Sequence, residues 1–215
     1  KFRDLLGATA HSPAMLFYLD NWQSAAPNQP AMLNPDMARR LNDPRLPPAQ
    51  RQQLTPRLEQ AKRLQPKGLN ENYARELMEL HTLGVDGGYT QHDVIDVARA
   101  LTGWTIDRPQ QGGAFVFRPQ MHDTGPKTIL GVAFTGNGGE DEGERVLDLL
   151  AKHPSTAHHI AFELAQRFIA DEPPASLVDR AAKVFLDTKG DLREVTRVVI
   201  TSPEFFESDT YRAKV

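Results

Sequence analysis

The amino-acid sequence predicts a mainly α-helical protein, a single helical-array domain with one small antiparallel β-hairpin near residues 114–134. Apolar residues recur every three or four positions over most of the second half of the chain, which is typical of amphipathic helices. N-capping residues and glycine stops bound the most regular of these stretches. Only between Trp104 and Phe134 does the apolar period change toward two, as in strands. We therefore expect residues 1–215 to form one predominantly helical domain.

The composition is that of an ordinary globular chain, and it excludes several functional classes. With 215 residues, of which 40% are hydrophobic, the chain is long enough to bury a sizeable core. The absence of cysteine excludes disulfides, thiolate zinc sites, iron–sulfur clusters and cysteine nucleophiles. The net charge of -3 provides no general field to attract nucleic acid, so we expect no nucleic-acid partner. No apolar stretch approaches about 20 residues, so we expect no integral membrane segment in this chain.

The first third of the chain combines a short helix with a long irregular stretch. Ser12 and Pro13 precede an apolar run that ends near Asp20, which predicts a buried helix with a capping serine and a proline in its first turn. Repeated Pro and Asn residues predict a loop from position 21 to 48. Leucine and alanine spaced three or four apart predict an amphipathic helix over 50–65, despite Pro56.

The most clearly marked helices form a predicted hairpin over positions 70–103. Asn70 is a good N-cap for a helix that runs to Leu83, and Gly84 follows as a stop. Residues 90–93 have the form of a capping box and begin a second helix that ends at Gly103.

Two short stretches of alternating character follow this hairpin. Residues 114–117 and 128–132 are predicted strands on either side of a turn-rich segment, and we expect them to form the small hairpin. Later helices are expected around 146–150 and over 160–169, 177–186 and 192–200.

Polar side chains are concentrated on the helix over residues 70–81. Helical spacing places Asn72, Glu76 and Glu79 on one face, with Arg75 in reach of Glu79 and His81 at the end. One interpretation makes Glu76 and Glu79 a metal-binding or acid/base pair joined by His81, whose oxygen and nitrogen atoms would suit a divalent cation of unknown identity. In this interpretation Glu76 is the catalytic residue, and Asn72, Arg75, Glu79 and His81 are binding residues. The other interpretation is a structural ion-pair network, with His81 bonded to the last carbonyls of the helix.

A second polar group lies in the turn between the two predicted strands. A rigid hairpin can direct His122 and Asp123 toward a shared point as a catalytic pair, with Lys127 as a binding residue. Alternatively, Asp123 bonds its own turn backbone and Lys127 is solvated.

Two functions remain after the common motifs are considered. The chain lacks the His-Glu-x-x-His zinc motif, the Walker A loop, the Gly-x-Ser-x-Gly elbow and the Rossmann fingerprint. The first function is a binding or assembly module. The alternative is a metal-assisted or acid/base hydrolase that uses the helix of Glu76 and His81 together with the turn of His122 and Asp123. The two polar groups would have to meet in space for the second function.

Three segments carry a family resemblance: NENYARELMELHTLG at 70–84, YTQHDVIDVARALTGW at 89–104 and HDTGPK at 122–127. They resemble a bacterial family of uncharacterised proteins, the domain of unknown function 1800 (DUF1800). The resemblance covers nearly the whole chain, and residues 28–66 depart from it as a probable inserted loop and helix.

The resemblance also implies a setting and a partner. It implies an exported, bacterial, periplasmic protein and a protein partner from a neighbouring exported family. The chain begins without Met or a signal-peptide pattern, so we expect it to be an excerpt of a longer protein. The family supplies no reaction and no established catalytic residues.

Overall fold

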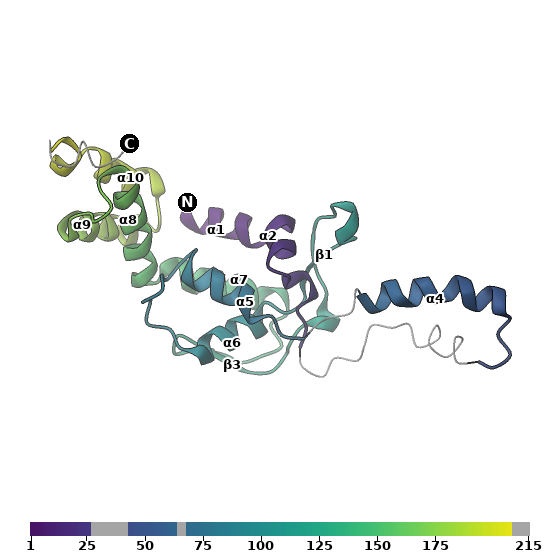
Figure 1. Ribbon diagram of the computed structural model, residues 1–215. Coiled ribbons are helices and arrows are strands. Elements are labelled where there is room, and N and C mark those ends of the chain that lie inside the picture. The colour runs from purple at the N-terminus through teal and green to yellow at the C-terminus, as the bar shows by residue number, and fades with distance from the viewer. Residues whose placement is uncertain (27–42, 64–67, 208–215) are drawn as a thin grey trace.

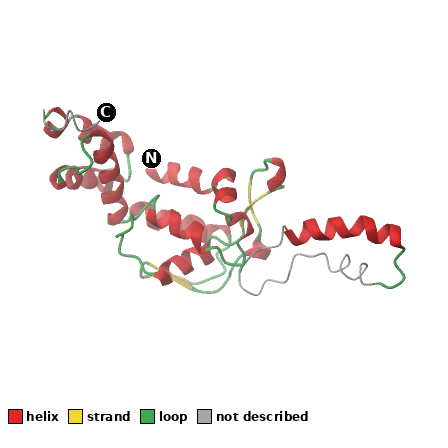
Figure 2. Cartoon of the chain, viewed as in Figure 1, coloured by secondary structure: helices red, strands yellow, loops and turns green. Residues whose placement is uncertain are grey.

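The computed structural model describes residues 1–26, 43–63 and 68–207 of the chain. Within these ranges the protein is mainly α-helical, with two small antiparallel sheets of two strands each (Figures 1 and 2). The predicted fold class is therefore confirmed.

Nine α-helices occur in the described ranges: α1 (Phe2–Ala10), α2 (Pro13–Tyr18), α4 (Pro48–Arg63), α5 (Glu71–Glu79), α6 (Gln91–Ala100), α7 (Glu140–Lys152), α8 (Pro154–Phe168), α9 (Ala175–Asp187) and α10 (Leu192–Ile200). Short 3-10 turns connect some of them: η1 (Asn21–Gln23), η2 (Pro109–Gln111), η3 (Pro119–Met121) and η4 (Pro203–Phe206). None of the described helices is both long and apolar enough to cross a membrane.

The helices pack in two groups. Helix α9 packs on α8 and α10 to form the C-terminal group, while α5 packs on α6 and α1 packs on α7 in the body of the molecule. Helix α4 projects away from the body (Figure 1). It confirms the helix predicted over 50–65. The rest of the predicted insert, residues 28–42 and 64–66, lies outside the described ranges.

The strands pair differently from the prediction. Strand β1 (Trp104–Ile106) pairs with β2 (Phe115–Phe117), and β3 (Lys127–Ile129) pairs with β4 (Val132–Phe134). The stretch predicted as one strand over 128–132 folds back on itself, because Leu130 and Gly131 both have positive φ angles, of 50° and 76°. Two such residues are the mark of a two-residue hairpin turn that matches the natural twist of the strands. The 114–117 strand therefore has β1 as its partner.

One predicted helix boundary is wrong, and one helix was missed. Helix α5 ends at Glu79 rather than Leu83, because the chain turns through Leu80–Gly84 and Gly84 adopts a φ of 83°. The Leu83 N–H bonds to the Met78 carbonyl at 2.7 Å in this turn. Helix α1 was not predicted, although its buried Phe2, Leu6 and Ala10 have helical spacing.

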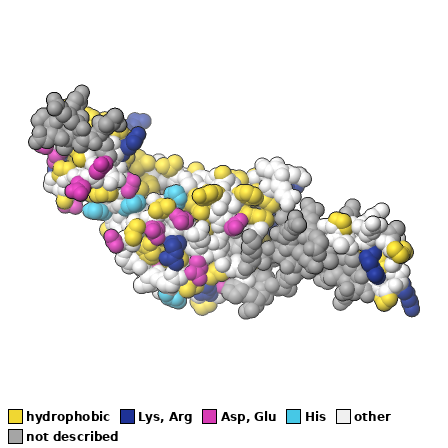
Figure 3. Space-filling model, viewed as in Figure 1, with side chains coloured by type: hydrophobic (Ala, Val, Ile, Leu, Met, Phe, Trp, Pro, Cys, Tyr) yellow, Lys and Arg dark blue, Asp and Glu magenta, His cyan; other side chains and the backbone are white. Residues whose placement is uncertain are grey.

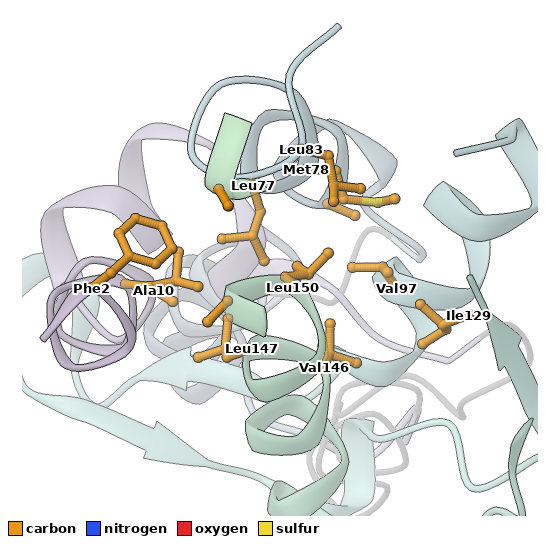
Figure 4. Close-up of a cluster of buried hydrophobic side chains, with 14 of the residues drawn as sticks. Phe2, Ala10, Leu77, Met78, Leu83, Val97, Ile129, Val146, Leu147 and Leu150 are labelled. Atoms are coloured by element: carbon orange, nitrogen blue, oxygen red, sulfur yellow. The ribbon is translucent and has the colours of Figure 1, made fainter. Parts of the chain in front are cut away.

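The hydrophobic core extends from α1 to α10, and one part of it lies between α1, α5, α6 and α7. Leu77 and Met78 of α5, Val97 of α6 and Leu147 and Leu150 of α7 converge there (Figure 4). The hydrophobic contacts fix the three helices α5, α6 and α7 relative to one another. The polar residues at the edges of these helices are positioned by that packing.

Candidate functional site

The start of α5 is held by its capping residue. Asn70 Oδ1 accepts hydrogen bonds from the N–H groups of Asn72 at 3.0 Å and Tyr73 at 3.3 Å. The Asn70 amide donates to the Leu19 carbonyl at 2.6 Å. This one side chain therefore satisfies the helix terminus and ties α5 to the end of α2.

A cavity of about 300 Å³ lies at this junction. We call it the α2–α5 cavity; its lining residues are Tyr18, Leu19, Asp20, Gln23, Gly68, Leu69, Asn70, Glu71 and Asn72. Among the predicted site residues only the exposed Asn72 lines it. Gln23 was not predicted, and its side-chain oxygen is buried without a hydrogen-bond partner.

The charged residues of α5 bond mainly to the beginning of α6 and the loop before it. Arg75 donates to Gln91 Oε1 at 2.6 Å, and the Gln91 amide donates to Glu71 at 2.6 Å. Glu79 accepts from the Tyr89 hydroxyl at 3.4 Å. Arg75 therefore bonds to Gln91 and not to Glu79, the partner that helical spacing suggested. These bonds hold the predicted helical hairpin together.

Glu76 and His81 lie near each other at the C-terminal end of α5, and His81 is also near His159 of α8. Burial and the neighbouring His159 lower the pKa of His81, although Glu76 opposes the change. His159 reaches back to the Leu80 carbonyl at 3.3 Å. Both Glu76 and His81 are half-buried, so the polar side of α5 points toward other protein groups rather than fully into solvent.

The second predicted group forms a buried charged cluster. Lys127 Nζ donates to Glu142 Oε2 at 2.6 Å, and the two side chains are 0% and 1% exposed. Two further acceptors, the carbonyls of Asp123 at 2.6 Å and Gly125 at 2.9 Å, complete the contacts of the ammonium. All three donors of this ammonium are therefore used within the protein.

His122 is the third member of this cluster, which we name the buried triad: His122, Lys127 and Glu142. Its Nδ1 lies 2.9 Å from the Thr102 carbonyl, and because a carbonyl only accepts, Nδ1 carries the proton. Its Nε2 lies 3.4 Å from Glu142 Oε2 and has no hydrogen-bond partner.

The carboxylate of Asp123 binds α6, and its Oδ1 lies 4.0 Å from Lys127 Nζ of the triad. Its carboxylate accepts from two nitrogens of Arg99, at 2.9 Å and 3.1 Å, and Arg99 also pairs with Asp96 at 2.7 Å. Burial raises the pKa of Asp123, but the bonds from Arg99 and the Gly125 N–H outweigh it and lower the pKa below its usual value. Asp96 in turn accepts from the Thr128 N–H at 2.6 Å. The turn is thereby fixed on α6.

The structure brings together only part of the predicted site. His122, Asp123 and Lys127 belong to one network, whereas the α5 residues belong to another. Within the described ranges no hydrogen bond or ion pair joins the two networks. In the same ranges no group of three His, Asp or Glu residues is arranged to hold a metal ion.

Glu142 is the important residue that sequence reasoning missed, because it stood among three acidic residues in the first turn of α7. The sequence nevertheless indicated that Glu142 is buried. Glu142, Val146 and Leu150 are four residues apart and share the buried face of α7. An acidic residue in phase with a core stripe is expected to have a buried cationic partner.

Searches of curated proteins and of solved structures found no match. A family model described as "Protein of unknown function (DUF1800)" matches residues 1–215, and it includes the Asn70–Gly84, Tyr89–Trp104 and His122–Lys127 segments whose geometry is given above. The chain therefore belongs to the DUF1800 family.

Proposed function

We propose that this protein is a binding or assembly module that acts with a protein partner. The observation that supports this most directly is the buried triad. Its charges are neutralised by one another and by backbone carbonyls, and Lys127 and Glu142 have almost no exposed surface. Groups arranged in this way stabilise a fold and are closed to a substrate. In this proposal the polar residues of the 122–127 segment have a structural role inside the protein.

The surface formed by α2 is the best candidate for the partner. Tyr18 is 85% exposed, and the half-exposed Phe17 stacks on Trp22 with ring centroids 5.9 Å apart. Hydrophobic side chains gather over α1 and α2 on the face shown in Figure 3. Exposed tyrosine and tryptophan residues often contribute most of the binding energy of protein interfaces. An aromatic surface beside a polar cavity therefore fits a protein ligand.

The partner and the cellular setting follow from the family resemblance. We propose a bacterial, exported or periplasmic location and a partner from the neighbouring exported family. Acidic, basic and histidine side chains are interspersed on the visible face, without a continuous basic area (Figure 3). This distribution supports a protein partner over a nucleic acid.

The test is a binding measurement with the purified neighbouring protein, by calorimetry or biolayer interferometry. Tyr18→Ala is expected to weaken binding at least tenfold while leaving thermal unfolding unchanged, because Tyr18 is almost fully exposed. Phe206→Ala is the matched control, since Phe206 is 73% exposed but lies in η4. Equal loss in both variants, or none in either, would contradict the α2 surface as the interface.

A hydrolase function has one observation in its favour. His122 Nε2 is buried without a hydrogen-bond partner, 3.4 Å from the Glu142 carboxylate. Such a nitrogen is a candidate general base if a conformational change admits a substrate or a divalent metal. In that version Glu76, His122 and Asp123 are the catalytic residues, and Asn72, Arg75, Glu79, His81 and Lys127 bind the substrate. The closed geometry of the triad favours the binding function.

A further inference from the structure

We propose that the α2–α5 cavity receives a basic side chain, arginine or lysine, from the protein partner. This inference rests on the binding function proposed above and names the chemistry of its ligand. The cavity includes the exposed Tyr18 in its lining and is formed by two segments of the chain, 18–23 and 68–72.

The lining offers acceptors and acidic groups. The carboxylate of Glu71 and the amides of Gln23 and Asn72 support the inference; Asp20 and Asn70 also line the cavity but have contacts of their own within the chain, and none of the nine lining residues is Lys, Arg or His. Glu71 accepts a bond from Gln91 through Oε2 only, so within the described residues its other oxygen has no bonded donor. A ligand rich in donors and positive charge complements such a lining.

Gln23 gives independent support for a donor in the cavity. Its side chain is only 6% exposed, yet Oε1 has no hydrogen-bond partner. A buried acceptor without a partner is unfavourable, and a ligand that donates to it removes the penalty. A guanidinium has five N–H donors and an ammonium has three, whereas a carboxylate ligand would add only further acceptors.

The helix terminus at the cavity does not favour an anion. The N-terminus of a helix normally attracts negative charge. Here the Asn72 and Tyr73 N–H groups already bond to Asn70 Oδ1, and Glu71 stands in the first turn of α5. Two N–H groups of the terminus are therefore bonded within the chain, and the Glu71 carboxylate adds a negative charge that favours a cationic ligand.

Tyr18 completes the cavity at its rim. An aromatic ring attracts a cation placed over its face, and arginine is the commonest partner. The 85% exposed ring of Tyr18 can close over a guanidinium inserted between η1 and the start of α5. This arrangement joins the aromatic surface of α2 and the polar cavity into one interface.

The experiment is an NMR titration of the ¹⁵N-labelled protein with N-acetyl-arginine amide, N-acetyl-lysine amide and the neutral analogue N-acetyl-citrulline amide. The two cationic probes are expected to shift the backbone amides of 18–23 and 68–72 at millimolar concentration, and citrulline is not. Glu71→Gln should weaken arginine binding roughly threefold, as expected for a partly exposed ion pair. Glu140→Gln is the matched control, because Glu140, like Glu71, is a carboxylate in the first turn of a helix, but it is exposed and lies outside the cavity.

Three results would overturn the inference. These are no shifts at the cavity with either cation, equal shifts with citrulline, or shifts with a disaccharide such as chitobiose in place of arginine. The failure of the inference is distinguishable from that of the proposed function. If the partner binds wild type and Glu71→Gln with equal affinity but binds Tyr18→Ala more weakly, the inference of a basic side chain in the cavity is refuted. The α2 surface then still stands as the proposed interface. A partner that does not bind wild type refutes the proposed function itself.

Discussion

Replacing Glu142 with glutamine should destabilise the protein strongly, although the change removes only one charge. Lys127 would then remain as a buried ammonium that has lost its closest counter-charge. The next carboxylate oxygen, Asp123 Oδ1, lies 4.0 Å from Lys127 Nζ and is already bonded to Arg99. Breaking one partner of a buried ion pair typically destabilises a protein by about 3–5 kcal/mol.

The structure places the expected loss near the lower end of that range. Lys127 keeps its bonds to the Asp123 and Gly125 carbonyls, and the new amide oxygen can still accept. We therefore expect about 3 kcal/mol, which for a chain of this size corresponds to a fall in Tm of roughly 6–12 °C. Urea unfolding followed by circular dichroism measures it, with the exposed Glu140→Gln as control, expected within about 0.5 kcal/mol of wild type. A loss below about 1 kcal/mol for Glu142→Gln would refute the buried-charge argument.

Two further predictions concern α7 and the end of α5. Gly143→Ala should lower stability by about 1–3 kcal/mol in urea unfolding, because the added Cβ would lie 2.2 Å from the Trp104 ring; an unchanged or raised midpoint would contradict this packing. His81→Gln should flatten the pH dependence of stability below about pH 6.5. Burial and His159 lower the folded-state pKa of His81, so the unfolded chain binds the proton more readily than the folded protein does. The wild-type protein therefore loses stability as the pH falls through this window. His153, whose pKa burial also lowers, remains in the variant, so the slope of unfolding free energy against pH should decrease but not vanish.

Local features of the fold were predictable because their causes are local. Asn70 and the Thr90–Asp93 capping box mark the starts of α5 and α6 through bonds within three residues. The strand pairing was not predictable in the same way. Leu130 gives no sequence signal for a positive φ, so the Leu130–Gly131 turn was hidden inside an apolar stretch.

The candidate site shows the same division between local and distant causes. The segment 122–127 stood out because its polar residues are close in sequence. Its partners, Arg99 and Glu142, come from two different helices and reach it only through the packing of α6 and α7 in the core. Helical spacing predicts which face of α7 holds Glu142, but not which of several cations it will meet.

Replacing both Lys127 with methionine and Glu142 with leucine separates the two functions of the buried triad. A buried ion pair exchanged for apolar residues of similar size is often neutral in stability, although the two carbonyls bonded to Lys127 lose a donor. We expect the double variant to be more stable than Glu142→Gln and within about 2 kcal/mol of wild type. If the triad only supports the fold, this variant keeps full affinity for the partner. If His122 acts as a base beside Glu142, any hydrolytic activity of wild type disappears while the protein stays folded, and that result would reverse the preference for a binding module.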